Sequence, residues 1–221
     1  STLRKTLFPY TTLFRSVKSL VFSSSGTVYG DTAAVCAEGD LGALPISLYG
    51  AAKLAGEALI SAFVECFGLR GLIYRFGNVV GPRGTHGAAL DFFKKLEKTP
   101  NELEVLGDGS QAKPYVYVTD CVDGILFGLD RAAGPLDIFN IAPPDTTSVK
   151  RIAELCVAAS PFPAASIRYT GGARGWPGDV PKSRLATDKL GELGWRVPKT
   201  SDEALRLAVT ALSAEVFGSR S

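Results

Sequence analysis

The sequence predicts an α/β protein, with a parallel sheet that carries helices on its faces and a smaller α/β lobe beside it. From residue 17 onward, short β-branched and aromatic runs alternate with longer helical stretches, and this alternation is typical of parallel sheets. The 221 residues suffice for one large or two small domains. No apolar run approaches the length that spans a bilayer, so we expect no membrane segment.

The first elements are a strand, a long helix and a second strand. VKSLVFSSS (17–25) is rich in strand-forming residues and stops at small polar ones. Residues 47–67 predict a helix that ends at Gly68, its C-cap. LRGLIYRF (69–76) predicts the next strand, which ends in the glycine-rich loop GNVVGPRG.

Shorter elements follow, as expected for a second lobe, and a cleft between two lobes is a common ligand site. Ser148 is the expected N-cap of the helix VKRIAELCVAA. The other helices are expected over 87–98, 120–129, 187–193 and 201–214, and the strands over 102–106, 115–118, 137–142 and 166–169.

Residues 1–16 do not fit this pattern. LFPYTTLFRS (7–16) resembles the in-frame translation of a sequencing-adapter oligonucleotide, so we interpret residues 1–16 as an artefactual leader. A genuine β-strand with a proline at its edge is the alternative.

Composition excludes several classes of function. A net charge of +2 gives no basis for a nucleic-acid or membrane-surface partner. The four cysteines are widely spaced without a CxxC, and there is a single histidine. This pattern predicts reduced thiols in a cytoplasmic protein, with no metal site and no disulfide framework.

Tyr49 and Lys53 stand four residues apart on the long helix, so their side chains share one face. Such a pair alone is most often an ordinary surface contact. Two polar clusters follow neighbouring strands, namely Ser23 to Ser25 and Asn78. In parallel sheets ligands bind beyond the carboxyl ends of the strands, so both clusters are candidate binding residues.

Five stretches occur in the order typical of one family. With them the chain resembles the extended short-chain dehydrogenases/reductases, specifically the nucleoside-diphosphate-sugar epimerases. The stretches are FSSSGTVYGD (22–31), LYGAAKLAGE (48–57), YRFGNVVGPR (74–83), VLGDGSQAKPYVYVTD (105–120) and GGARGWPGDVP (171–181). A lone YxxxK is weak, whereas the ordered set is specific.

The resemblance implies a redox epimerisation with NAD as the cofactor. A secondary alcohol is oxidised to a ketone and reduced again from the other face, while NAD holds the hydride between the two steps. The hydroxyl proton needs a base, and a free tyrosine, with a pKa of about 10, is too weak without a nearby cation. Tyr49 would be this base and later the acid, and Lys53 would also bind the nicotinamide ribose. Ser23 would contribute to the cofactor site.

The resemblance also implies substrate contacts. Ser25 would bind the sugar hydroxyl and orient its proton, with Thr27 as a weaker candidate, and Asn78 would contact the diphosphate. From the residues alone, Ser23 to Ser25 could simply terminate a strand, and Asn78 could be a turn residue. Arg83 is either a solvated charge or a substrate contact.

Two positions depart from the family pattern. Lys113 stands where an arginine usually faces the diphosphate. A lysine can bind phosphate but cannot make the two parallel hydrogen bonds of an arginine. Trp176 stands where some epimerases carry arginine, so Arg174 and Asp179 are the expected nucleotide-side contacts. Trp176 is either core packing or a wall against the base.

The turn SGTVYG (25–30) carries no carboxylate. Sugar-nucleotide dehydratases and decarboxylases of the family place acids there for proton transfer. We therefore expect epimerisation at C4 of a UDP-hexose through a 4-keto intermediate. A dehydratase, decarboxylase or reductase of the same family, and a non-catalytic sugar-nucleotide-binding homologue, are the alternatives.

The sequence contains no GxGxxG or GxxGxxG turn to cradle a pyrophosphate. By resemblance we expect residues 17–80 to form part of a Rossmann-type NAD-binding domain that lacks its N-terminal βαβ units. Residues 81–221 would be mainly a sugar-nucleotide lobe, with some segments returning to the first domain. We expect the chain as written to bind NAD weakly and to be inactive, and the family's homodimer to form through a helix pair that includes 47–67.

Overall fold

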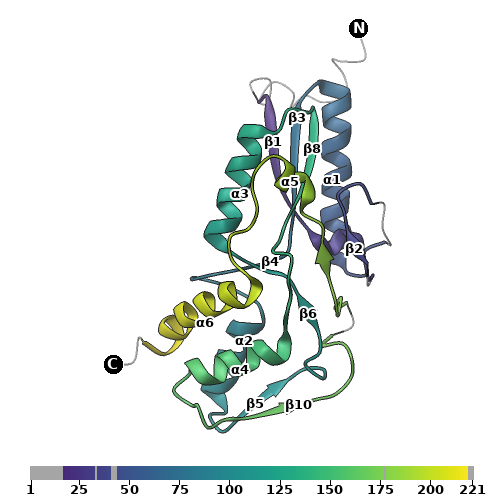
Figure 1. Cartoon of the computed structure of the whole chain (residues 1–221). Helices are drawn as coiled ribbons and strands as arrows, with labels where there is room; N and C mark the ends of the chain where they lie inside the picture. The colour runs from purple at the N-terminus through teal and green to yellow at the C-terminus, as the bar shows by residue number, and fades with distance from the viewer. Residues whose placement is uncertain (1–16, 33, 41–43, 177, 219–221) are drawn as a thin grey trace.

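A parallel three-stranded sheet forms the upper part of the molecule in Figure 1, a computed structural model of the chain. Its strands are β1 (Ser19–Ser25), β3 (Arg70–Phe76) and β8 (Leu136–Ile141), in the order β1-β3-β8. The structure describes residues 17–32, 34–40, 44–176 and 178–218, so the expected leader 1–16 lies outside the described residues. The predicted α/β class is confirmed.

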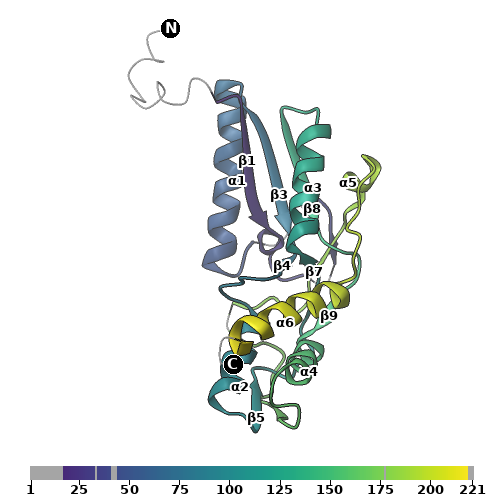
Figure 2. The ribbon, with the colours of Figure 1, turned by 90° about the vertical axis from the view of Figure 1, so that its left-hand side faces the viewer.

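Two helices cover opposite faces of this sheet (Figures 1 and 2). Side chains alternate between the faces of a strand, and the two sides of central β3 accordingly enter different cores. Ile73 packs with Ile60 and Val64 of α1 (Leu48–Phe67). On the other face, Leu72 and Tyr74 pack with residues of α3 (Val118–Arg131) and with Leu190 of α5 (Asp188–Glu192).

The long helix α1 begins and ends at the residues that its sequence indicates. The Ser47 side chain accepts a hydrogen bond from the Gly50 amide, which caps the first turn. Gly68 ends the helix in the left-handed conformation, with φ of 67°. The prediction over 47–67 is therefore confirmed, with Ser47 as the cap.

A second group of elements lies below the sheet in Figure 1. It comprises α2 (Ala88–Lys98), β5 (Glu102–Val105), α4 (Val149–Ala159), β10 (Ser166–Tyr169) and α6 (Ser201–Phe217). These elements share one apolar core that includes Phe93, Leu96, Ile152, Cys156 and Leu205. β10 pairs with β5 in parallel.

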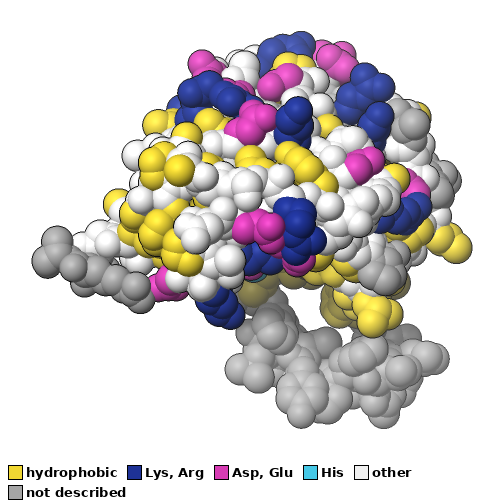
Figure 3. Space-filling view, turned by 90° about the horizontal axis from the view of Figure 1, so that it is seen from below, with side chains coloured by type: hydrophobic (Ala, Val, Ile, Leu, Met, Phe, Trp, Pro, Cys, Tyr) yellow, Lys and Arg dark blue, Asp and Glu magenta, His cyan; other side chains and the backbone are white. Residues whose placement is uncertain are grey.

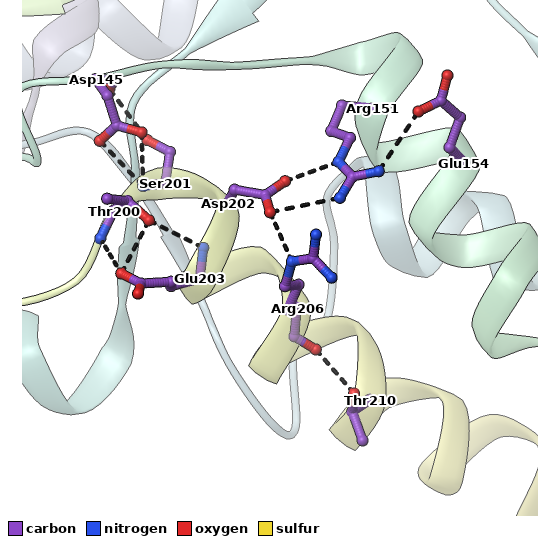
Figure 4. A network of polar contacts seen from close by, with 9 residues as sticks. All are labelled: Asp145, Arg151, Glu154, Thr200, Ser201, Asp202, Glu203, Arg206 and Thr210. Atoms are coloured by element: carbon purple, nitrogen blue, oxygen red, sulfur yellow. Dashed lines mark hydrogen bonds and ion pairs between the residues drawn. The ribbon is translucent and has the colours of Figure 1, made fainter.

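An ion-pair network joins α4 to α6 (Figure 4). Arg151 Nε donates to Asp202 at 2.8 Å, and Arg206 Nε donates to the same carboxylate at 2.6 Å. The hydrogen bond from Arg151 lowers the pKa of Asp202. At its N-terminus, α6 starts with a capping box between Thr200 and Glu203.

The chain also forms short strands that the sequence analysis did not anticipate. The stretch assigned to a loop after residue 76 contains β4 (Asn78–Val80), which pairs in parallel with β7 (Tyr115–Tyr117). β2 (Val35–Cys36) pairs with β11 (Arg184–Leu185), and β6 (Ala112–Lys113) pairs antiparallel with β9 (Thr147–Ser148). Strands of two or three residues carry no measurable period, so pattern alone cannot find them.

Several predicted boundaries are also wrong by a few residues. Val118, assigned to a strand, begins α3, which extends from Val118 to Arg131 rather than over 120–129. β1 starts at Ser19 rather than at residue 17, and α6 continues to Phe217 rather than 214. Helix and strand ends are decided by caps and tertiary pairing more than by propensity.

Charged side chains of both signs are interspersed with apolar ones on the face seen from below (Figure 3). In the second group of elements, Arg168 of β10 pairs with Glu102 and Glu104 of the neighbouring β5. Among the described residues, no helix is both long enough and apolar enough to cross a membrane.

Candidate active site

Ser25 is the last residue of β1 and the cap of a short 3-10 turn, η3 (Gly26–Tyr29). Its Oγ accepts hydrogen bonds from the Thr27 backbone N–H at 3.2 Å and from the Thr27 hydroxyl at 3.0 Å. Both acceptor positions of the Ser25 hydroxyl are thus in use, and its own proton remains available to donate. The hydroxyl therefore caps the turn that follows the strand, and it can still act as a donor toward a ligand.

Lys53 is anchored beside this turn. Its Nζ donates to the backbone carbonyl of Ser23 at 2.7 Å and lies 5.6 Å from the centroid of the Tyr49 ring. An ammonium has three donors, so at least one further hydrogen bond can be made. Tyr49 is 56% exposed, so its side chain is accessible from solvent.

The first turn of α1 approaches the Ser25 turn closely. A Cβ placed on Gly50 would lie 2.9 Å from the Thr27 carbonyl oxygen, nearer than real Cβ contacts. Six residues further along, a Cβ on Gly56 would lie 2.5 Å from the Phe22 ring of β1. The absence of these side chains lets the helix that carries Tyr49 and Lys53 lie directly against β1 and η3.

A buried ion pair that the sequence analysis missed lies behind these residues. Arg75 of β3 donates to Glu57 of α1 through Nη2 at 2.7 Å and Nε at 3.0 Å, and Ser24 donates to the same carboxylate. The Arg75 guanidinium stacks over Tyr29 at 4.8 Å, and Tyr29 donates to Asn140 at 2.8 Å. Burial raises the pKa of Tyr29.

One signal could have pointed to this pair. Glu57 lies four residues after Lys53 and eight after Tyr49, on the same helix face as buried Ile60 and Val64. A carboxylate on a buried face requires a partner. The identity of that partner depends on strand pairing, in which Ser24 stands beside Arg75.

A second cluster gathers three of the expected substrate residues. Lys113 Nζ forms an ion pair with Asp179 at 2.6 Å, and the Arg174 Nη1 donates to the Asp179 backbone carbonyl at 3.1 Å. Arg174 also pairs with Asp31 at 2.5 Å. Asp31 is the last residue of the FSSSGTVYGD stretch, so this contact ties the end of the serine motif to the 171–181 loop. Trp176 is 55% exposed rather than in a core.

Asn78 and Arg83 lie apart from both clusters. Asn78 is exposed at the start of β4, and its backbone N–H donates to Pro114. Arg83 has a φ of 59°, which is unusual for a residue with a Cβ, and its backbone N–H donates to the Glu215 carboxylate of α6 at 2.9 Å. In the part of the chain that the structure describes, no hydrogen bond or ion pair joins either residue to Ser25, Tyr49 or Lys53.

Comparison with known proteins identifies the family of the chain. A model of the NAD dependent epimerase/dehydratase family matches residues 10–142. The UDP-glucose 4-epimerase of Corynebacterium glutamicum is 28% identical over 207 residues, with 84% of this chain and 60% of the relative covered. The first curated relatives are covered over 44% to 62% of their own length.

Solved structures agree in fold. A UDP-galactose 4-epimerase superposes with a TM-score of 0.83 and 36% identity, over 93% of this chain and 67% of that one. The UDP-glucose 4-epimerase of Thermotoga maritima with UDP-glucose superposes with a TM-score of 0.77 and 30% identity, over 93% and 66%. With its Rossmann-type parallel sheet and the matched region of 10–142, the chain belongs to the NAD dependent epimerase/dehydratase family, within the extended short-chain dehydrogenases/reductases.

Proposed function

We propose that this site epimerises a UDP-hexose at C4 through a transient 4-keto sugar, with NAD as the cofactor. The observation that carries the proposal is the anchoring of Lys53. Its ammonium is fixed to the Ser23 carbonyl and faces the Tyr49 ring, at the carboxyl end of β1 where the Ser25 turn begins. The proposed proton-transfer residues, Ser25, Tyr49 and Lys53, thus lie on adjoining elements.

Tyr49 takes the proton of the C4 hydroxyl during oxidation and returns it during reduction. Lys53 places its positive charge 5.6 Å from the centroid of the Tyr49 ring, beside the group that exchanges the proton. The Ser25 hydroxyl donates a hydrogen bond to the C4 oxygen and holds it near Tyr49. The hydrogen bond from Thr27 fixes the rotamer of the Ser25 hydroxyl.

The nicotinamide end of NAD fits the donors present. Lys53 keeps a donor beyond its bond to Ser23, and this donor is available to a ribose hydroxyl. The Ser23 carbonyl holds Lys53 in place and so contributes to the same end of the site. When bound, NAD supplies a hydride acceptor that becomes the hydride donor of the return step.

Lys113 and Arg174 are proposed to bind the UDP diphosphate, with Asp179 holding both of them. Phosphate oxygens would share these cations with Asp179 and Asp31, because each cation retains unused donors. Asn78 and Arg83 are proposed as further contacts on the nucleotide side. Arg83 is supported by its exposed position in the loop after β4 and by its uncommon backbone conformation.

Three coarser features of the molecule belong to the same proposal. Residues 17–80 would form the NAD side, and 81–221 mainly the sugar-nucleotide side, with β8 returning to the first sheet. A homodimer would form through the exposed apolar side of α1, which carries Leu59, Phe63 and Phe67. A cytoplasmic location is supported by four free cysteines.

The proposed reaction can be tested in D₂O. The inactivity expected of the chain as written follows from weak NAD binding, because the sequence contains no glycine-rich phosphate turn. The chain is therefore incubated with UDP-galactose and with NAD at millimolar concentration, to fill the cofactor site despite weak binding, and the products are identified by NMR. We expect UDP-glucose that retains hydrogen at C4, since the hydride stays on the cofactor. Deuterium at C4 would contradict the redox route, a 4-keto-6-deoxy product would indicate a dehydratase, and no turnover would overturn the proposed activity.

A further inference from the structure

The Glu57–Arg75 ion pair is buried, with side chains 6% and 8% exposed. Taking two charges out of water is costly, and their attraction offsets this cost only when the geometry is good. A buried ion pair is therefore weak evidence for stability, and apolar residues of similar volume often replace one without loss. Its place in this core calls for a different explanation.

Glu57 joins α1 to β1. It follows Lys53 by one helical turn and Tyr49 by two, on the same face of the helix. Its carboxylate accepts from the Ser24 hydroxyl, while Lys53 donates to the carbonyl of the preceding residue, Ser23. Two successive turns of the helix thus bind two successive residues of the strand, directly before Ser25.

Arg75 connects that contact to the Ser25 turn. It stands beside Ser24 in the parallel pairing of β1 with β3. Its guanidinium reaches Glu57 on one side and stacks on Tyr29, the last residue of η3, on the other. Nη1 also donates to the backbone carbonyl of Glu38 at 3.2 Å. One planar cation therefore contacts both the helix of Tyr49 and Lys53 and the turn that Ser25 caps.

We propose that Glu57 and Arg75 are positioning residues, which set the register of α1 against β1 and hold η3 in place, so that Ser25, Tyr49 and Lys53 face one ligand. Neither residue touches the substrate in this scheme. The positioning role follows from the contacts alone, whereas its effect on turnover rests on the proposed function. A slip of α1 by one residue moves Tyr49 by about 1.5 Å. Misplacement of about 1 Å can cost ~100-fold in rate.

The experiment compares two double variants. Glu57→Leu/Arg75→Met removes the buried pair but keeps apolar volume, so we expect an unfolding midpoint close to that of the unchanged chain. Glu102→Leu/Arg168→Met removes a pair that is 42% and 51% exposed in the second group of elements, and it serves as the control. A second probe, Glu57→Gln, keeps the side-chain volume but removes the charge that pairs with Arg75, and it is read in the same way if the first variant unfolds.

Two readouts separate positioning from mere stability. In ¹H–¹⁵N spectra, the amides of Ser23 to Thr27 and Tyr49 should shift or broaden in Glu57→Leu/Arg75→Met, while those of α2, α4 and α6 stay in place. In turnover assays, kcat should fall about 100-fold with KM changed less than about threefold, and the control should keep both.

Unchanged site amides in a folded Glu57 variant would overturn the positioning role, whatever the turnover. If the unchanged chain shows no turnover, the proposed function fails, and the spectra alone then decide the role of the pair. If both Glu57 variants unfold, the pair acts on stability and the proposal is wrong.

Discussion

In the proposed mechanism, Lys53 supplies the positive charge beside the Tyr49 ring. Replacing it by methionine keeps the apolar stem but removes the bond to the Ser23 carbonyl and the charge beside Tyr49. We expect Lys53→Met to lower turnover by about 100-fold or more, in the range typical of lost acid–base assistance.

Lys95 provides a matched control, because its Nζ also donates to a backbone carbonyl, that of Glu104, at 2.9 Å. Lys95→Met should lose a similar amount of thermal stability but keep its turnover. Equal turnover in the two variants, measured with NAD and UDP-galactose, would remove Lys53 from the mechanism.

Gly50 tests how closely the Tyr49 turn lies against the Ser25 turn. Alanine normally favours a helix over glycine by up to about 1 kcal/mol. Here its Cβ would come within 2.9 Å of the Thr27 carbonyl, and overpacking costs about 1–3 kcal/mol. Gly50→Ala should therefore lower the free energy of unfolding, measured by urea titration.

Gly39 has nothing within 4 Å of its Cβ position, so Gly39→Ala is the matched control and should change stability by less than about 0.5 kcal/mol. A more stable Gly50→Ala chain would mean that helix and turn are further apart than described.

At the scale of elements, α1 serves two surfaces. Its inner face carries Lys53, Glu57 and Ile60 against the sheet, while Leu59, Phe63 and Phe67 on its outer side are 62%, 47% and 49% exposed. Exposed apolar patches of this kind often mark an interface. We expect the chain to sediment as a dimer and Phe63→Glu to sediment as a monomer.

Leu126 of α3 is 58% exposed on the other side of the sheet and supplies the comparison. Leu126→Glu should leave the dimer intact. Dissociation by Leu126→Glu but not by Phe63→Glu, measured by analytical ultracentrifugation, would place the interface elsewhere.

The long elements could be predicted from the sequence, and the short ones could not. The helix over 47–67 has a cap at each end and an apolar face, and these local signals determine its bounds. β4 and β6 have no local signal, because their residues become strands only through distant partners. These partners stand 37 positions further along the chain for β4 and 34 to 36 for β6. The same limit hid the Arg75 partner of Glu57.

The sequence predicted the residues of the candidate site that belong to local motifs, but not the contacts between distant residues. Ser25, Tyr49 and Lys53 belong to recognisable motifs, and the structure brings Lys53 to Ser23 and Tyr49. Lys113, Arg174 and Asp179 also meet, as a group that the motifs name but do not arrange. The part of Asp31 in this cluster depends on a side-chain contact across 143 residues, which no spacing rule encodes.

At the scale of the whole molecule, the Arg151–Asp202 contact joins two helices of the second group (Figure 4). Hydrogen bonding by Arg151 lowers the pKa of Asp202 from its ordinary value of about 3.9. A carboxyl group with a lowered pKa stabilises the fold above its unfolded pKa and loses this effect as pH falls through its folded value.

Asp202→Asn should therefore lower stability by about 0.5–1 kcal/mol at neutral pH, as expected for a half-exposed pair. The difference from the unchanged chain should shrink as pH falls below about 4. Urea titrations between pH 3 and 7 measure it, and a difference that grows toward low pH would contradict the role of Asp202.

The site as a whole is assembled from segments distant in the sequence. Within it, the proposed role of Tyr49 as the base is the assignment on which the reaction depends. The most direct measurement is the rate of UDP-galactose to UDP-glucose conversion by Tyr49→Phe, with the affinity for the UDP-sugar measured in parallel. Tyr169→Phe, in β10 of the second group, is the control. We predict that Tyr49→Phe loses at least about 100-fold in turnover while its affinity for UDP-galactose is kept. Turnover equal to that of Tyr169→Phe would contradict the assignment of Tyr49 as the base.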